Sequence, residues 1–294
     1  MRSAVIKELI VTVAPAPARV VIPRFPGNKR IAVTTSWDDG LVFDRPVVEA
    51  FNRWGIKGTF NLNSGILGRT GKPTPIEAKQ RIDACEVAEL YAGHEVAVHS
   101  ATHPSATLVS LAEFAQEIID DRKALEDLVC YPVRGMAYPN GAYNAEVIAL
   151  LRQLGIVYAR TTEAVPNCFP VAEPLAWPAT MHWQASNPSP MPQRWNECYN
   201  NSRWSGVFFI WGHSYEFDRG DCWDKLESYF APLGGKSDVW YCTNIELWDY
   251  HYARSRLVVA ANKRTAYNPS AIPVSVSIDG KVMDIPPGKV TPLV

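Results

Sequence analysis

Four side chains in two short segments have the types and spacing of a hydrolytic metal site. The segment TSWDDG carries Asp38 and Asp39, and the segment HSATHP carries His99 and His103. A divalent cation such as zinc binds through imidazole nitrogen and carboxylate oxygen, and a catalytic site keeps a position open for water. One Asp and two His provide three ligands. The other Asp is then free to act as a general base toward water that the cation acidifies.

Both segments lie where an apolar, strand-like run ends. IAVTTSW precedes Asp38, and HEVAVHS runs through His99. A DDG tripeptide alone is most often a turn, and a pair of histidines four residues apart is a weak signal alone. However, α/β enzymes place their active sites at the carboxyl ends of parallel strands. We therefore interpret the two segments as parts of one site.

The pattern between and beyond these segments predicts an α/β fold. One helix begins at Asp44 and stops at Gly55, and another begins at Ser110 with Glu113 completing a capping box. Strand-like runs alternate with such helices, so roughly seven repeats suggest a (β/α)7 barrel more than an open sheet. The further predicted elements are strands at 57–63, 156–161, 207–213 and 238–242 and a helix at 144–155.

Composition shifts predict three regions. Residues 1–30 carry four prolines and should form an extended arm over the domain surface. Residues 31–254 should form the catalytic domain. Residues 255–294 lose the helical pattern, and their alternating runs around Asp279 and Gly280 predict a hairpin in a small β appendix.

Composition also restricts partners and location. The 294 residues have a net charge of −1 and no run of Lys or Arg, which disfavours nucleic acid as a partner. There is no apolar stretch long enough to span a membrane, and Lys7 and Glu8 interrupt any secretory signal. The six cysteines are scattered, which suits buried, reduced thiols. We expect a soluble cytoplasmic protein with a neutral or weakly charged substrate; the sequence does not determine its oligomeric state.

The motifs resemble those of a known family, the polysaccharide deacetylases of the NodB-homology type, carbohydrate esterase family four. TSWDDG resembles the first motif, usually TFDDG, and HSATH matches the second, HSxxH. AYPNGAYN resembles the third, and IWGHSYEF resembles the last, which carries a histidine. The resemblance covers about 31–250 and indicates a divergent branch. It implies an irregular (β/α) barrel with about seven strands and a metal-dependent amide hydrolase acting on N-acetylated sugars.

The resemblance also implies roles for individual residues. Asp38 would be the catalytic base, Asp39, His99 and His103 the metal ligands, and His213 the general acid. These roles suit amide hydrolysis, which needs an activated water, a stabilised oxyanion and a proton for the leaving nitrogen. Oxygen and nitrogen ligands of this kind suit Zn²⁺, with Co²⁺ or Ni²⁺ as alternatives.

The third motif departs from the family pattern RxPYG. Aligning its Pro and Gly puts Ala137 at the position of the Arg that orients the base, and Asn140 at the Tyr position. The backbone N–H of Asn140 could still bind the oxyanion, because that role needs no side chain. Arg134 and Arg160 are the candidates to replace the missing Arg.

Some neighbouring residues are candidates without a motif match. Glu216 or Asp218 could pair with the acid histidine, and His182 is a candidate site residue. Tryptophans near motif positions could stack on sugar rings, although most tryptophans pack in cores. Those near the motifs are Trp37, Trp183 and Trp211.

The sequence therefore favours a metal-dependent deacetylase acting on an N-acetylated, possibly O-acetylated, carbohydrate. One alternative is a hydrolase of another C–N bond, such as a cyclic amide, but relatives of that kind tend to lose metal ligands. A second alternative is an inactive carbohydrate-binding relative, which would have no need of Asp38 and His213.

Overall fold

The computed structural model describes residues 19–68, 80–167 and 169–293. Contacts divide the chain into two units. One unit spans Arg24–Tyr252, and the other combines the described residues up to Pro23 with those from Ala253 onward.

The larger unit is a closed parallel barrel. One segment closes it: β7 pairs with β6, β8 pairs with β9, and only Thr180 separates β7 from β8. The segment thus joins both edges of the sheet, so that strands β2 to β6, this segment and β9 occupy seven positions. The predicted α/β barrel is confirmed. Its strands are β2 (Ile31–Asp38), β3 (Gly58–Leu62), β4 (Glu95–Val98), β5 (Gly135–Ala137), β6 (Tyr158–Ala164), β7 (Trp177–Ala179), β8 (Met181–His182) and β9 (Gly206–Gly212).

One predicted strand lies outside these seven positions. The run at 238–242 forms β10 (Val239–Tyr241). Among the described strands, β10 pairs only with the first half of β2, and β3 pairs with the second half. The closing segment takes the place expected of β10. Its sequence gave no strand signal, because Pro178 interrupts an already short run and a proline removes a backbone donor.

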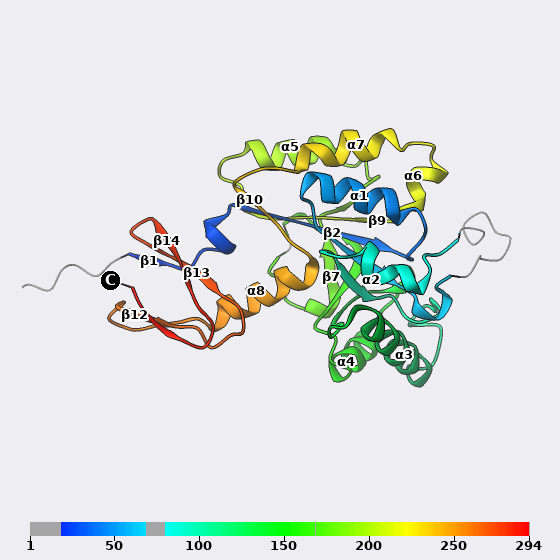
Figure 1. Cartoon of the computed structure of the whole chain (residues 1–294), viewed down its shortest axis with the longest axis horizontal. Coiled ribbons are helices and arrows are strands. Elements are labelled where there is room, and N and C mark those ends of the chain that lie inside the picture. The colour runs from blue at the N-terminus through cyan, green and yellow to red at the C-terminus, as the bar shows by residue number, and fades with distance from the viewer. Residues whose placement is uncertain (1–18, 69–79, 168, 294) are drawn as a thin grey trace, which may run out of the picture. The chain divides into compact units, whose positions relative to one another are not determined.

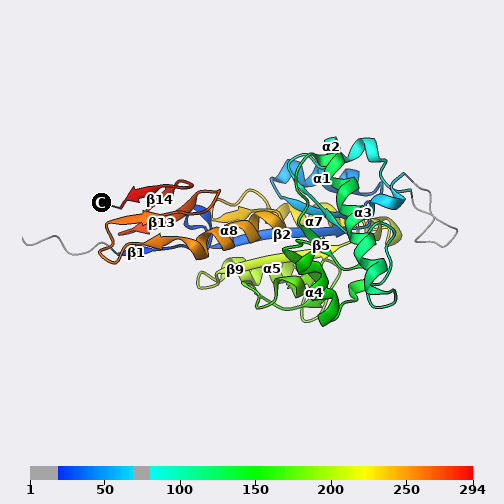
Figure 2. The same ribbon diagram turned by 90° about the horizontal axis from the view of Figure 1, so that it is seen from below.

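Helices surround the barrel, with α1, α5 and α7 on one side of the strands in Figure 1 and α3 and α4 on the other. The view in Figure 2 likewise separates α1 and α2 from α4 and α5. The helices are α1 (Asp44–Trp54), α2 (Val87–Leu90), α3 (Leu111–Val129), α4 (Ala145–Gln153), α5 (Met191–Asn200), α6 (Tyr215–Arg219), α7 (Asp224–Phe230) and α8 (Asn244–Arg256).

The helix ends follow the predicted capping signals. Gly55 ends α1 in the left-handed conformation, at φ 67°. Ser110 and Glu113 form both hydrogen bonds of the capping box at the start of α3. Asn144 caps α4 by accepting a hydrogen bond from the backbone N–H of Val147. The three predicted helices are confirmed.

Side chains alternate along each strand between the outside of the barrel, where they pack against the helices, and its interior. On β2, Ile31, Val33 and Trp37 pack outward against the helices. Trp37 has no exposed surface and contacts Phe51, among other rings of that layer. Burying a large apolar side chain of this kind stabilises a fold by about 1.5–3 kcal/mol. The inward positions of β2 are more polar, and they end at Asp38.

The amino-terminal end of the barrel is filled by a buried hydrogen-bond network. Glu95 accepts hydrogen bonds from the hydroxyls of Thr59 and Tyr158 and from the backbone N–H of Ile245, in the first turn of α8. A helix amino terminus favours a carboxylate, but burial raises the pKa of Glu95 to about 7. Buried side chains fill the amino-terminal end of the barrel, so the carboxyl-terminal end is the one available for the predicted site.

The smaller unit contains two antiparallel sheets of three strands each. Asp279 and Gly280, at φ 49° and 87°, form the two-residue turn of the predicted hairpin, between β13 and β14. The chain before residue 19, and with it most of the predicted arm, lies outside the described residues. The strands are β1 (Val20–Val21), β13 (Val274–Ile278) and β14 (Lys281–Ile285) in one sheet, and β11 (Val258–Val259), β12 (Thr265–Tyr267) and β15 (Val290–Pro292) in the other.

Two composition-based expectations can be compared with the described part of the chain. None of its helices is long and apolar enough to cross a membrane. Its five cysteines are all free thiols. However, Cys85 and Cys130 are exposed, so the expectation of buried thiols is wrong for these two. The cytoplasmic location remains a prediction.

Candidate active site

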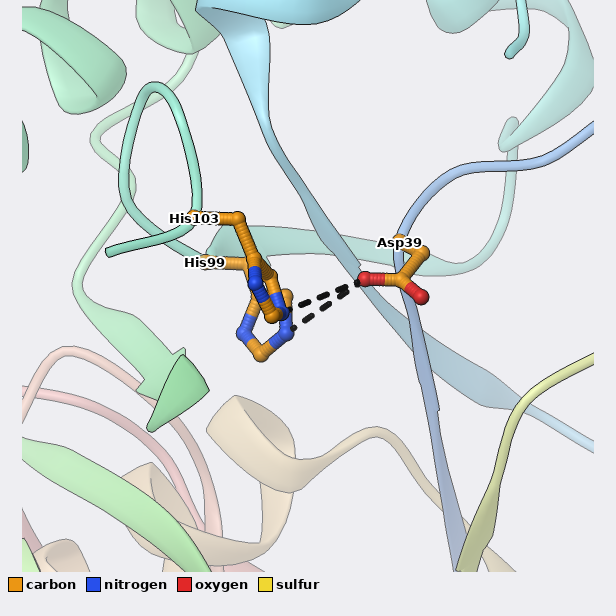
Figure 3. Close-up of side chains that lie close together, drawn as sticks. All are labelled: Asp39, His99 and His103. Atoms are coloured by element: carbon orange, nitrogen blue, oxygen red, sulfur yellow. Dashed lines mark ion pairs between the residues drawn. The ribbon is translucent and has the colours of Figure 1, made fainter. Parts of the chain in front are cut away.

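The predicted metal ligands converge at the carboxyl ends of β2 and β4. Asp39 directly follows β2, His99 directly follows β4, and His103 lies in the loop after His99. Figure 3 shows both imidazoles facing the Asp39 carboxylate. Asp39 Oδ1 lies 3.8 Å from His99 Nε2 and 3.5 Å from His103 Nε2. The three potential ligand atoms lie within 4.8 Å of one another, which is close enough for one cation.

Contacts with neighbouring elements fix His99 in a ligating form. Its Nδ1 lies 2.8 Å from the carbonyl oxygen of Ala137, at the end of β5, so Nδ1 donates and Nε2 keeps a free lone pair. Its backbone N–H donates to Asp121 of α3, over 3.0 Å. Burial lowers the pKa of His99 to about 4, so the imidazole is neutral, as metal binding requires.

The cluster fits a divalent cation. Asp39 Oδ1 is buried and has no hydrogen-bond partner among the described residues. A buried carboxylate oxygen without a partner is costly, and a cation held between it and the two Nε2 atoms would satisfy it. The two imidazole nitrogens suit a transition metal such as zinc better than magnesium or calcium, which prefer oxygen ligands throughout.

Asp38 lies beside this cluster, inside the barrel, and is only 3% exposed. The guanidinium of Arg160, from β6, hydrogen-bonds to both of its carboxylate oxygens, and Asn61 of β3 donates to Oδ1 over 2.9 Å. Burial acts to raise the pKa of Asp38, but the charge of Arg160, its hydrogen bond to the carboxylate and the nearby imidazoles of His99 and His213 together outweigh burial and hold the pKa well below its usual range. Asp38 is therefore a buried, ionised carboxylate held in one orientation.

This contact decides between the two candidate arginines. Arg160 has no exposed surface, and its guanidinium lies 4.4 Å from the centre of the Trp211 ring. Arg134 instead precedes β5 at the other end of the barrel and pairs with Asp249 of α8, over 2.6 Å. The arginine that orients the carboxylate thus comes from β6, one strand beyond the position where the family motif has it.

His213 faces Asp38 across the mouth of the barrel. It follows β9, and its Nε2 lies 3.8 Å from Asp38 Oδ2. Its Nδ1 lies 3.1 Å from Oε1 of Glu216, in α6. Burial acts to lower the pKa of His213, but the hydrogen bond to Glu216 and the charge of Asp38 raise it to about 8. Of the two candidate partners, Glu216 is the one that contacts His213, whereas Asp218 is exposed.

Asn140 lies at the same end of the barrel. It occupies a short 3-10 turn (Pro139–Gly141) after β5, and its side-chain amide donates to the hydroxyl of Ser105 over 2.8 Å. Ser105 follows His103 by two residues, so this contact connects the turn to the loop that carries His103.

Unusual backbone conformations cluster around the site. Of the ten described residues that are not glycine and have positive φ angles, four lie around the site: Asp39 at 81°, Ser100 at 61°, His103 at 69° and Asn140 at 56°. Each such conformation costs of the order of 1–3 kcal/mol and persists only where its surroundings impose it. The concentration at one mouth is what a constrained functional site produces, and sequence patterns do not reveal it.

The three tryptophans near the motifs differ in location. Trp37 and Trp183 have no exposed surface, so both are core residues and neither can stack on a sugar. Trp211 is partly exposed and lies against Arg160. His182 also lies at this mouth, 3.2 Å from Glu216. Sequence reasoning missed Asn61 and Asp121, which support Asp38 and His99.

The larger unit is thus a closed parallel barrel with carboxylates and imidazoles gathered at the carboxyl ends of its strands. Comparisons with known proteins show which proteins this chain is similar to. Residues 26–159 match the model of the polysaccharide deacetylase family, which is the family that the motifs resemble. The matched residues include Asp38, Asp39, His99 and His103 but end before Arg160.

Two relatives define the extent of the similarity. The peptidoglycan-N-acetylglucosamine deacetylase PgdA of Listeria monocytogenes is 33% identical over 136 residues, which cover 45% of this chain and 26% of the relative. The chain therefore spans about a quarter of that relative's length. A solved structure from Mycobacterium smegmatis, assigned to the polysaccharide deacetylases, superposes with a TM-score of 0.56 and 18% identity. It covers 82% of this chain and 96% of that one, which supports the fold.

Proposed function

We propose that this protein is a metal-dependent hydrolase that removes acetyl groups from an N-acetylated carbohydrate. The observation that carries the proposal is the arrangement of Asp38 and His213. These two lie 3.8 Å apart, beside the Asp39, His99 and His103 cluster. An ionised carboxylate and an imidazole facing each other provide a base and an acid for one reaction. The matching relative from Listeria, named a deacetylase of an N-acetylated sugar, supports the choice of substrate class.

Asp39, His99 and His103 would hold the cation, with Zn²⁺ the first choice and Co²⁺ or Ni²⁺ as alternatives. When bound, such a cation polarises a carbonyl group and lowers the pKa of water.

Asp38 would act as the general base. Arg160 and Asn61 keep it ionised and fix its orientation, with Oδ1 held by Asn61 and Oδ2 facing His213. The carboxylate accepts one proton from the water that attacks the acetyl carbon. The backbone N–H of Asn140 would donate to the oxyanion that develops on the acetyl oxygen, which needs a donor at the mouth and no particular side chain.

His213 would act as the general acid. With Nδ1–H donating to Glu216, the proton on Nε2 is the one that faces Asp38 and the mouth. Breaking the C–N bond leaves the bonding electron pair on nitrogen, and the Nε2 proton is transferred to that nitrogen. The products are acetate and a free amine. A histidine with its pKa raised to about 8 is largely protonated at neutral pH, as this step requires.

The two alternatives explain less of the site. An inactive carbohydrate-binding protein has no use for a buried Asp38 and Arg160 pair opposite a histidine. A hydrolase of cyclic amides would share the acid and the base, so activity must separate it from a deacetylase. The test is acetate release from a panel of N-acetylated and O-acetylated glycans and from cyclic amides, with and without chelator. Acetate release that chelator abolishes is the expected result, and turnover of cyclic amides alone would overturn the proposal.

A further inference from the structure

The Glu216 carboxylate, which contacts the proposed acid His213, accepts more hydrogen bonds than the pairing with the His213 side chain alone requires. It is 5% exposed, so its charge must be met within the protein. Oε2 accepts from the indole N–H of Trp183 at 2.7 Å, from the backbone N–H of His213 at 3.1 Å and from His182 Nε2 at 3.2 Å. Oε1 is left facing His213 Nδ1, at 3.1 Å. Three donors on one oxygen thus fix the direction of the other.

His182, which ends the barrel-closing segment, is itself held in place. Its Nδ1 accepts from the backbone N–H of Gln184 over 3.2 Å, so in the neutral ring the proton is on Nε2 and points at Glu216. Its ring meets Trp211 edge-on, with ring centres 4.7 Å apart at 81°. His182 can therefore donate to Glu216 whether it is neutral or charged.

The backbone is shaped for the same arrangement. A Cβ at Gly212 would lie 2.2 Å from the Trp183 ring and 3.2 Å from Glu216 Oε2. Only glycine at the end of β9 lets the indole approach the carboxylate this closely.

We infer that His182 is a positioning residue that acts through Glu216 on the acid His213, forming a histidine, carboxylate, histidine relay at the mouth of the barrel. The inference rests on the proposed function and deepens it. His182 does not touch the reacting atoms. It clamps Glu216 Oε2, so that Oε1 holds His213 Nδ1 and Nε2 keeps its direction toward Asp38.

The electrostatic surroundings agree with this geometry. The groups that face His213 are Asp38 and Asp39 from the end of β2, Glu216 and the Tyr215 ring from α6, and His182 from β8, through Glu216. Burial acts to raise the pKa of Glu216, but hydrogen bonds from His182 and His213 hold it well below its usual range. Glu216 therefore stays ionised at every pH at which His213 can act as the acid.

Paired substitutions at His182 test the inference in the metal-loaded protein. His182→Ala removes the donor, whereas His182→Gln can still donate an amide N–H to Glu216. We expect His182→Ala to lower kcat on an N-acetylated substrate on the order of tenfold, the effect of losing one hydrogen bond to a charged group. KM and metal content should not change. His182→Gln should recover most of the loss, and His251→Gln, a histidine on α8, serves as the control.

A double substitution shows whether His182 acts through His213. If it does, adding His182→Ala to a His213→Ala variant should cost less than about twofold further, because the group it positions is already gone. Independent, multiplying losses would assign His182 to substrate binding or to the fold and would overturn the inference. A second metal equivalent bound in the wild type and lost in His182→Ala would also overturn it, since the trio would then be a second metal site.

A spectroscopic readout does not depend on activity. In protein labelled with nitrogen-15 histidine, neutral His213 should carry its proton on Nδ1, and His182→Ala should increase the other tautomer. His182→Gln should keep the wild-type tautomer. If the wild type releases no acetate but His213 responds in this way, the proposed function fails and the relay stands. If acetate is released and the His213 tautomer is unchanged by His182→Ala, the relay fails and the function stands.

Discussion

The buried pair of Arg160 and Asp38 allows a quantitative test of how the site is built. Its two side chains are 0% and 4% exposed. Replacing one member of a fully buried ion pair leaves the other as an uncompensated charge, which costs about 3–5 kcal/mol. We therefore expect Arg160→Met to lower the free energy of unfolding by about that amount. The substitution keeps an apolar side chain of similar length, so little of the loss can come from an empty cavity.

A thermodynamic cycle separates charge from packing. Asp38→Asn alone leaves the guanidinium of Arg160 without its carboxylate, whereas Asp38→Asn combined with Arg160→Met removes both charges. The double variant should be more stable than the sum of the single losses predicts, by about 1–3 kcal/mol. All three variants would be measured by urea denaturation of metal-free protein at neutral pH.

The chain offers a matched control. Arg134 pairs with Asp249, but these side chains are 35% and 36% exposed. Solvent screens such a pair, so Arg134→Met should cost no more than about 1 kcal/mol. Equal losses for Arg134→Met and Arg160→Met, or single losses at Asp38 and Arg160 that simply add, would refute the view that Arg160 holds Asp38.

Four further outcomes follow from the site. His99→Ala or His103→Ala should abolish stoichiometric metal, and undiminished metal by elemental analysis in both would remove them as ligands. Asp38→Asn should keep its metal and lose turnover on the order of 100 to 10,000-fold; a loss of only a few-fold would mean that Asp38 is not the base. His213→Ala should impair an N-acetyl substrate more than an activated ester, because an amine needs a proton to leave; equal losses would point to a structural role. Because the pKa of His213 is raised to about 8, activity should fall as the pH rises through that value. Glu216→Gln should shift this fall to lower pH. If the pH profile does not shift in this variant, Glu216 does not act on His213.

The sequence was sufficient for the fold class and for bringing Asp39, His99 and His103 together, because both depend on local patterns. The capping box at Ser110 and the stop at Gly55 define helix ends through hydrogen bonds within a few residues. Asp39 and His99 could be placed at strand ends because apolar runs precede them. The barrel-closing segment could not be found in this way, because its two strands are short and Pro178 interrupts the first of them.

The choice between Arg134 and Arg160 needed the structure. Which face of a strand points into a barrel depends on its register, and a shift of one residue reverses it. In β6, the side chains of Tyr158 and Arg160 both reach interior partners, Glu95 and Asp38. By contrast, Glu216 could have been preferred to Asp218 from the sequence, because a residue three positions along a helical turn faces back toward His213.

The location of the arginine bears on the choice between a hydrolase and a binding protein. Ala137 stands where the motif has arginine, and its backbone carbonyl supports His99 while the guanidinium reaches Asp38 from β6. The support for His99, a proposed metal ligand, and the support for Asp38, the proposed base, thus come from adjacent strands, β5 and β6. A buried guanidinium is costly to retain without its carboxylate. A carboxylate that is kept ionised and oriented, by an arginine from a different strand, therefore supports the proposal that Asp38 acts as the base.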